Sequence, residues 1–150
     1  MAVTTALRLP RGVRNHNPGN IRRTKTVWQG QAVKQTDDEF VCFETPTMGL
    51  RALMKVLLSY YRTHGLNTVR KIIQRYAPPN ENDTEIYIKS TAHRLGVDPD
   101  GAINPATPDM LVALAKAICR HECGPAPQGQ PLNWYSDDTY EEAARLALGK

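Results

Sequence analysis

The chain has 150 residues, enough for one domain with a buried core, and 41% of them are hydrophobic. No apolar stretch is long enough to cross a bilayer, which excludes a membrane-spanning protein from the expected classes. Lys and Arg outnumber Asp and Glu by 19 to 15, and the isoelectric point of about 9.1 suits an anionic polymer such as nucleic acid, teichoic acid or peptidoglycan without selecting among them.

The beginning of the chain is expected to be irregular. We expect residues 1–13 to form a flexible arm, which lacks the charged and apolar regions of a signal peptide. The segment NHNPGN that follows carries a strong turn signal, because Pro18 and Gly19 suit the second and third positions of a type II turn. From Val27 to Phe43, short apolar groups are mixed with polar breaks, which predicts a small β-hairpin or meander.

After residue 44 the sequence predicts helices. Thr45 and Pro46 can begin the first one, because a hydroxyl caps a helix and proline is tolerated at its first position, and Gly65 ends it. Four further helices are expected at about 67–76, 82–95, 107–122 and 138–148. The predicted fold is therefore a single, mostly α domain with a small β element near its N-terminus, and residues 125–150 supply a C-terminal loop and a short helix.

Glu122 continues the apolar face of the helix expected at 107–122. Leu111, Leu114, Ala115 and Ile118 recur at helical spacing, and four residues after Ile118 comes Glu122. Partial burial and the negative end of the helix dipole both favour the protonated form of a carboxyl group at such a position. A carboxyl group that keeps its proton near neutral pH can act as a general acid. The alternative is a terminal glutamate that bends into water.

The cysteines do not predict a metal site or a disulfide framework. Cys119 and Cys123 share one helix face, but His121 lies two residues from each and so falls on nearly the opposite face. No second pair of ligands stands nearby, and with Cys42 the cysteines are odd in number. We therefore expect reduced thiols, no metal and no organic cofactor.

Four segments, VRNHNPGNIRR, WQGQ, TDDEFVCFETPTMGLRAL and YAPPNENDTEIYI, together resemble a known family. They are similar to phage-encoded and bacterial peptidoglycan-degrading proteins of the lysozyme and lytic transglycosylase superfamily, some of them known only as virion structural proteins. The resemblance spans roughly residues 11–124. The part from residue 14 to residue 53 also resembles flagellar and autolysin-type glucosaminidases, whose turn, tryptophan segment, hairpin and strand correspond to NPGNIR, WQGQ, TDDEF and FVCFETP.

This resemblance implies a lysozyme-like domain that cleaves the β-1,4 bond between N-acetylmuramic acid and N-acetylglucosamine, with Glu122 as general acid. In those glucosaminidases the catalytic glutamate precedes the turn, whereas residues 1–14 here contain no acid and the Glu-then-Gly helix end stands at 122–124. We therefore hypothesise a circular permutation, which domains tolerate because their termini often lie close together. It predicts that Glu122 shares one cleft with the NPGNIRR turn and with residues 36–40.

The TDDEF segment offers a second carboxylate. Asp37 is the favoured residue, assisting the acid or stabilising positive charge on the sugar ring, with Asp38 and Glu39 left open. An inverting or retaining hydrolase needs such a group, whereas a lytic transglycosylase needs none, because the 6-hydroxyl of the sugar attacks. The alternative is a solvated acidic turn at the tip of a hairpin.

Substrate-binding roles are predicted for Asn20, Trp28, Glu39 and Tyr87. Asn20 can hydrogen-bond an N-acetyl group or hold the turn, the structural role being favoured for Asn17. Trp28 can stack on a sugar ring or fill the core of the small β element. Tyr87 can line the cleft or be a buried structural tyrosine.

Two other function classes compete with the glycosidase. A non-enzymatic virion or baseplate component could share the fold and only bind glycan or partner proteins. A nucleic-acid-binding protein rests on the isoelectric point alone, because the basic segments do not interleave aromatic residues. Without a signal peptide, we expect synthesis in the bacterial cytoplasm and action at the cell wall as an endolysin, a virion component or an antimicrobial secretion-system effector.

Overall fold

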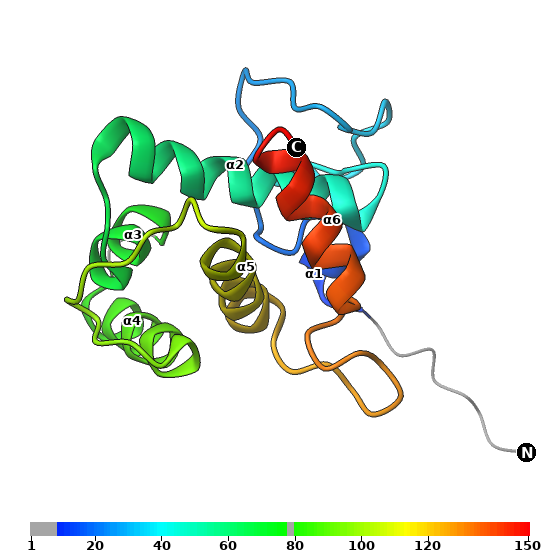
Figure 1. Ribbon diagram of the computed structural model, residues 1–150. Coiled ribbons are helices and arrows are strands. Elements are labelled where there is room, and N and C mark those ends of the chain that lie inside the picture. Colours follow the sequence, from blue (N-terminus) through cyan, green and yellow to red (C-terminus); the bar gives the residue numbers. More distant parts are fainter. Residues whose placement is uncertain (1–8, 78–79) are drawn as a thin grey trace, which may run out of the picture.

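The structure is a computed structural model of the chain, and it describes residues 9–77 and 80–150. In this part of the chain, six α-helices surround one main hydrophobic core (Figure 1). Their bounds are α1 Arg11–Arg14, α2 Pro46–His64, α3 Val69–Tyr76, α4 Glu81–Leu95, α5 Pro108–Cys123 and α6 Asp137–Ala147. The predicted mostly α class is confirmed, and every helix expected after residue 44 is present. Among the described residues, none of the helices combines the length and apolar character needed to cross a membrane.

Local capping explains where the helices begin and end. Thr45 accepts a hydrogen bond from the backbone of the first turn of α2, and Gly65 ends that helix with a left-handed φ of 65°. Asn80 caps the start of α4 in the same way, and Gly96 ends it with a φ of 68°. These signals are short-range, which is why the sequence predicts the helix bounds closely.

The central helix of the fold is α5. It contacts α1, α2, α4 and α6, and Figure 1 shows it between α6 on one side and α3 and α4 on the other. Its predicted apolar face is completely buried, as the exposed fraction is 0% for Leu111, Leu114, Ala115 and Ile118. Burying each leucine-sized side chain stabilises the fold by about 1.5–3 kcal/mol, so this face fixes the rotation of α5 and with it the direction of Glu122.

The β-hairpin or meander predicted between Val27 and Phe43 is not present. Within the described residues this region contains isolated bridges and no named strand. Side chains occupy backbone groups that a ladder would use: Gln35 bonds both the N–H and the C=O of Cys42, and Asn17 Nδ2 donates to the C=O of Val41 (2.9 Å). The segment is therefore an ordered loop in which amide side chains share the hydrogen bonding with isolated backbone–backbone bonds.

The N-terminal predictions need two further corrections. Residues 1–8 lie outside the described residues, but the expected arm ends earlier than residue 13, because Arg11–Arg14 form α1 against α5. A turn follows in which the N–H of Asn20 donates to the C=O of Asn17 (2.9 Å). It is not of type II, since the residue with positive φ is Asn20 (52°) and not Gly19.

Candidate functional site

Glu122 is the penultimate residue of α5, half-buried where that core helix ends. The chain turns away immediately afterwards at Gly124, which has a φ of 75°. None of the ion pairs formed by the described residues involves Glu122. The carboxyl group is therefore neither enclosed in the core nor neutralised by a Lys or Arg side chain of that part of the chain.

A side chain from the other end of the sequence reaches this carboxyl group. Asn20 Nδ2 donates a hydrogen bond to Glu122 Oε1 (3.1 Å), across 102 positions of sequence. Asn20 Oδ1 is buried and has no hydrogen-bond partner among the described residues. This oxygen has essentially no accessible surface and lies against Gly12 of α1, so it belongs to the packing of the turn and costs some free energy by having no partner.

The turn that carries Asn20 is fixed by its surroundings. Asn17 is completely buried, and its side chain makes three hydrogen bonds of 2.9–3.0 Å to backbone groups, which confirms the structural role predicted for it. The hydroxyl of Tyr76, at the end of α3, donates to the C=O of Gly19. Gly49 of α2 lies directly against the backbone of the turn, where no side chain would fit. The position of Asn20 thus depends on both α2 and α3.

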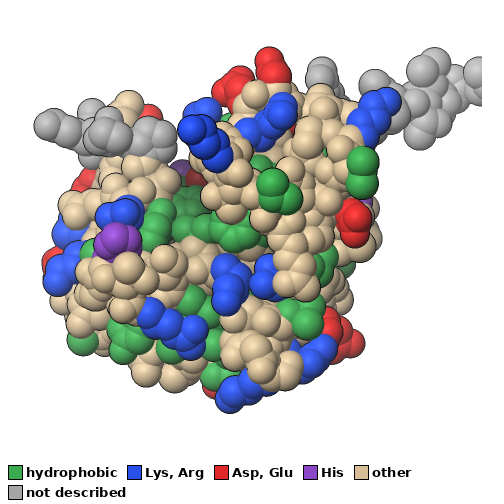
Figure 2. All heavy atoms as spheres, turned by 90° about the horizontal axis from the view of Figure 1, so that it is seen from above, with side chains coloured by type: hydrophobic (Ala, Val, Ile, Leu, Met, Phe, Trp, Pro, Cys, Tyr) green, Lys and Arg blue, Asp and Glu red, His purple; other side chains and the backbone are tan. Residues whose placement is uncertain are grey.

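Two hollows on the molecule share Glu122 and Ala77. The smaller one, of about 290 Å³, is lined chiefly by α4 and the end of α5 and includes Asp83, Tyr87 and His121. The larger one, of about 700 Å³, lies between the Asn20 turn, Phe40, α2 and α3. Figure 2 shows a hollow with apolar side chains on its floor and Lys and Arg side chains around it. The predicted common cleft is confirmed for the turn and for Phe40 of the 36–40 segment.

Tyr87 and His121 form the wall of the smaller hollow beside Glu122. Their rings stack with centroids 3.5 Å apart and an interplanar angle of 14°. Burial, followed by the negative charge of Glu122, raises the pKa of Tyr87, so its hydroxyl stays protonated. Burial lowers the pKa of His121, which keeps that ring neutral near pH 7. The Tyr87 hydroxyl is buried, makes no hydrogen bond of normal geometry with a described residue, and interacts with the neighbouring Glu122.

Asp37 has the contacts of an anchoring carboxylate. Its two oxygens accept hydrogen bonds from the Arg11 guanidinium (2.6 and 2.7 Å), from Asn15 Nδ2 (2.9 Å) and from the backbone N–H groups of Glu39 and Phe40. These contacts, the Arg11 bond foremost, hold the pKa of Asp37 well below its usual range. Asp37 ties α1 to the loop and is not among the residues that line either hollow. Its predicted catalytic role stays a prediction.

Replacing Asp37 by Asn should destabilise the fold in a pH-dependent way. The lowered pKa means that the unfolded chain binds this proton more readily, so the contribution of Asp37 is complete above the ordinary aspartate pKa of about 4 and is lost as the pH falls below it. We expect the Asp37→Asn variant to melt several degrees below wild type at pH 7 and the gap to shrink below about pH 4.

Asp38→Asn is the matched control for this prediction, because the Asp38 side chain is 94% exposed and only touches Arg11 at 3.6 Å. Thermal melts of both variants across the pH range measure the effect. Equal melting temperatures for wild type and Asp37→Asn at pH 7 would show that Asp37 does not anchor α1.

Two predicted substrate-binding residues lie apart from Glu122. Trp28 is half-buried against a small apolar cluster that contains Val41 and Phe43, which is its alternative, structural role. Glu39 pairs with Arg11 (3.5 Å) and Arg22 (3.3 Å) on the surface. Neither residue lines a hollow that contains Glu122, whereas Asn20 lines the larger hollow and Tyr87 lines the smaller one. Contact of any of the four with a sugar stays a prediction.

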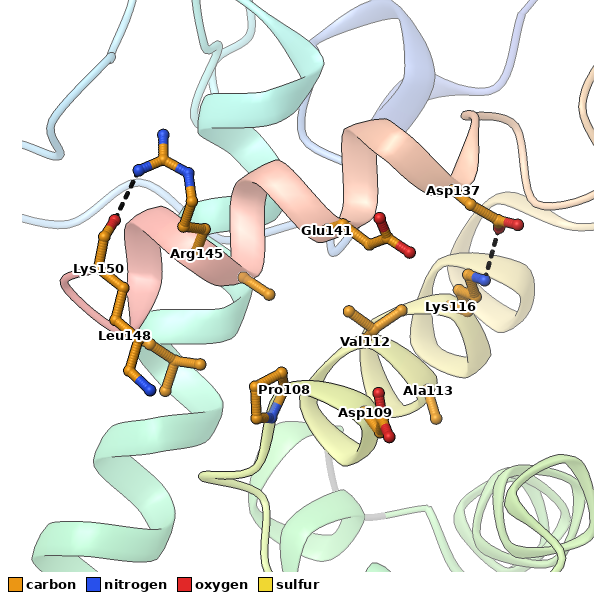
Figure 3. Close-up of a pocket in the computed structure, with 11 residues that line it drawn as sticks. Pro108, Asp109, Val112, Ala113, Lys116, Asp137, Glu141, Arg145, Leu148 and Lys150 are labelled. Carbon is orange, nitrogen blue, oxygen red and sulfur yellow. Dashed lines mark hydrogen bonds and ion pairs between the residues drawn. The ribbon is translucent and has the colours of Figure 1, made fainter.

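Another hollow, of about 540 Å³, lies between α5 and α6 (Figure 3). Lys116 and Asp137 form an ion pair across it (2.7 Å), and Arg145 donates to the C=O of Lys150 at its other end. Because no predicted site residue lies in it, we do not include this hollow in the candidate site.

Sequence reasoning missed several residues of the site. Arg75 and Tyr76 at the end of α3, and Phe40 in the loop, line the larger hollow with Glu122, and Asp83 lines the smaller one. No local pattern marks them, because their place depends on how α3 and α4 pack beside the Asn20 turn. The only signal in the sequence for these site residues is that a basic and an aromatic residue, Arg75 and Tyr76, stand together at the end of a predicted helix.

The comparison with known proteins gives a phage relative. Over 108 residues the chain is 38% identical to Protein P5 of Pseudoalteromonas phage PM2, and the alignment covers 69% of this chain and 68% of that protein. The name of this relative identifies a phage protein and assigns it no activity. No family model matches the chain.

Proposed function

This chain belongs to the family of Protein P5 of Pseudoalteromonas phage PM2, and from that premise we propose that it is a phage-encoded glycosidase that cleaves the glycan strands of peptidoglycan. The observation that carries the proposal is Glu122, a half-buried carboxyl group at the end of a core helix, shared by two hollows and bonded by Asn20. The lysozyme-like ancestry and the circular permutation form part of the same proposal.

In the proposed reaction Glu122 protonates the glycosidic oxygen between N-acetylmuramic acid and N-acetylglucosamine. The Asn20 amide occupies Oε1, which leaves Oε2 to carry the proton that is donated. The Tyr87 hydroxyl, kept protonated by burial, is a hydrogen-bond donor beside the acid and adds no second negative charge.

The contacts of the other carboxylates favour a lytic transglycosylase over a hydrolase. A hydrolase uses a second carboxylate to activate water or to attack the sugar. Asp37 is already bonded by Arg11, Asn15 and the backbone and lines neither hollow, which leaves Asp83 as the one other acid among the described residues that line a hollow with Glu122. Attack by the 6-hydroxyl of the sugar needs neither residue.

Mass spectrometry of digested cell walls tests this proposal. Purified sacculi treated with the protein should release fragments that end in anhydromuramic acid, one water lighter than fragments with a reducing end. Reducing ends instead, lost in an Asp83→Asn variant, would replace the transglycosylase by a hydrolase that uses Asp83. Release of no soluble fragment by the folded protein would contradict cleavage altogether.

A non-enzymatic virion component with the same fold is the second candidate function. A phage relative is consistent with this role, and its name assigns neither an activity nor a place in the virion. In this case the hollows would bind glycan or a neighbouring virion protein, and the digestion would yield no fragments.

A further inference from the structure

Two arginines stand over aromatic rings in the larger hollow. The guanidinium carbon of Arg22 lies 5.1 Å from the centre of the Phe40 ring, and that of Arg75 lies 5.4 Å from the centre of the Tyr60 ring. All four residues line the hollow of about 700 Å³ that also contains Glu122. A ring beneath a guanidinium group favours that position of the side chain by about 0.5–1 kcal/mol at an exposed site, so both cations are biased towards the hollow before any ligand arrives.

The charge of this hollow is unbalanced. Arg22 bonds Glu39 at the surface (3.3 Å), but Arg75 forms no ion pair with a described residue. Among the residues that line the hollow, Glu122 is the single acid. When Glu122 holds the proton that it donates, the hollow is positive, and a cleft lined by one sign of charge attracts ligands of the other sign.

We propose that Arg75, assisted by Arg22, binds a carboxylate carried by the glycan strand beside the bond that Glu122 cleaves, and so makes the site specific for acidic glycans over neutral ones. This inference rests on the proposed function. The carboxylate is either the lactyl group of muramic acid or an acid of its peptide stem. A guanidinium group suits both, because its N–H donors match the two oxygens of a carboxylate.

Binding to a matched set of fluorescently labelled glycan strands tests the proposal. The first probe is a strand that carries peptide stems. The second probe lacks the stems and therefore exposes its lactyl carboxylates. The third probe also lacks the stems, and its lactyl carboxylates are converted to neutral methylamides. Fluorescence anisotropy at low salt measures affinity, with Glu122→Gln introduced into every protein to prevent cleavage. The parent is the protein that carries Glu122→Gln and no other substitution. We expect it to bind a carboxylate-bearing strand about tenfold more tightly than the methylamide strand. Tight binding of the second probe assigns the lactyl group, and tight binding of the first alone assigns the stem.

Arg75→Gln should remove this preference by weakening binding of the acidic strands alone. Arg62→Gln is the matched control, because it removes the same charge from an exposed position of α2 outside both hollows. The proposal is overturned if the parent binds all strands equally, if Arg75→Gln keeps the preference, or if a single-stranded RNA of equal charge binds as tightly as the acidic strand. Binding does not depend on cleavage, so a protein that releases no fragments from sacculi would contradict the proposed function without deciding this result.

Discussion

Glu122→Gln is expected to slow the cleavage of peptidoglycan by at least ~10²-fold and by up to ~10⁴-fold, the range for loss of a general acid. Gln has nearly the same shape and keeps an oxygen for the hydrogen bond from Asn20 Nδ2. It cannot give a proton to the departing oxygen, so binding should survive while the chemical step fails. The rate at which purified sacculi release soluble fragments measures the effect.

The Glu122→Gln variant should remain folded, because Glu122 takes part in no ion pair among the described residues whose loss would unfold the chain. Its melting temperature should stay close to that of wild type. Glu141→Gln is the matched control, since Glu141 is exposed in the hollow between α5 and α6. If Glu122→Gln digests sacculi nearly as fast as wild type, Glu122 is not the acid and the proposed mechanism fails.

Gly49→Ala is expected to destabilise the fold severely. In an exposed helix this change stabilises by up to about 1 kcal/mol, because alanine is the better helix former. Gly49 is buried in α2, however, and an added Cβ would overlap the carbonyl oxygen of His16 in the turn before Asn20. That atom belongs to the backbone and cannot rotate away, so we expect a loss at the upper end of the ~1–3 kcal/mol that overpacking costs, or more.

Thermal or urea unfolding of the Gly49→Ala variant checks this expectation. Gly101→Ala is the control, because a Cβ at Gly101 would meet its nearest neighbours at an ordinary 3.4 Å and should leave stability almost unchanged. Since the Gly49 contact also positions the turn, the fraction of Gly49→Ala that folds should cleave glycan more slowly. A Gly49→Ala variant as stable as wild type would show that the turn is not fixed against α2.

The sequence by itself determined the helical fold of this protein. Thr45, Gly65 and Gly96 mark helix ends through contacts with their immediate neighbours, and the spacing of apolar residues on α5 determines which face is buried. The direction of Glu122 follows from that spacing alone. These features rest on interactions within a few residues, so they need no knowledge of how the helices pack.

The tertiary structure decided how these parts meet. The expected hairpin became an ordered loop because Gln35 and Asn17 take backbone groups that a ladder would use, a competition that apolar spacing does not reveal. Asp37 faces Arg11 and not the site, since α1 packs on α5. The meeting of Asn20 with Glu122, 102 residues apart, depends on the packing of α2, α3 and α5, because that packing brings the turn to the end of the core helix.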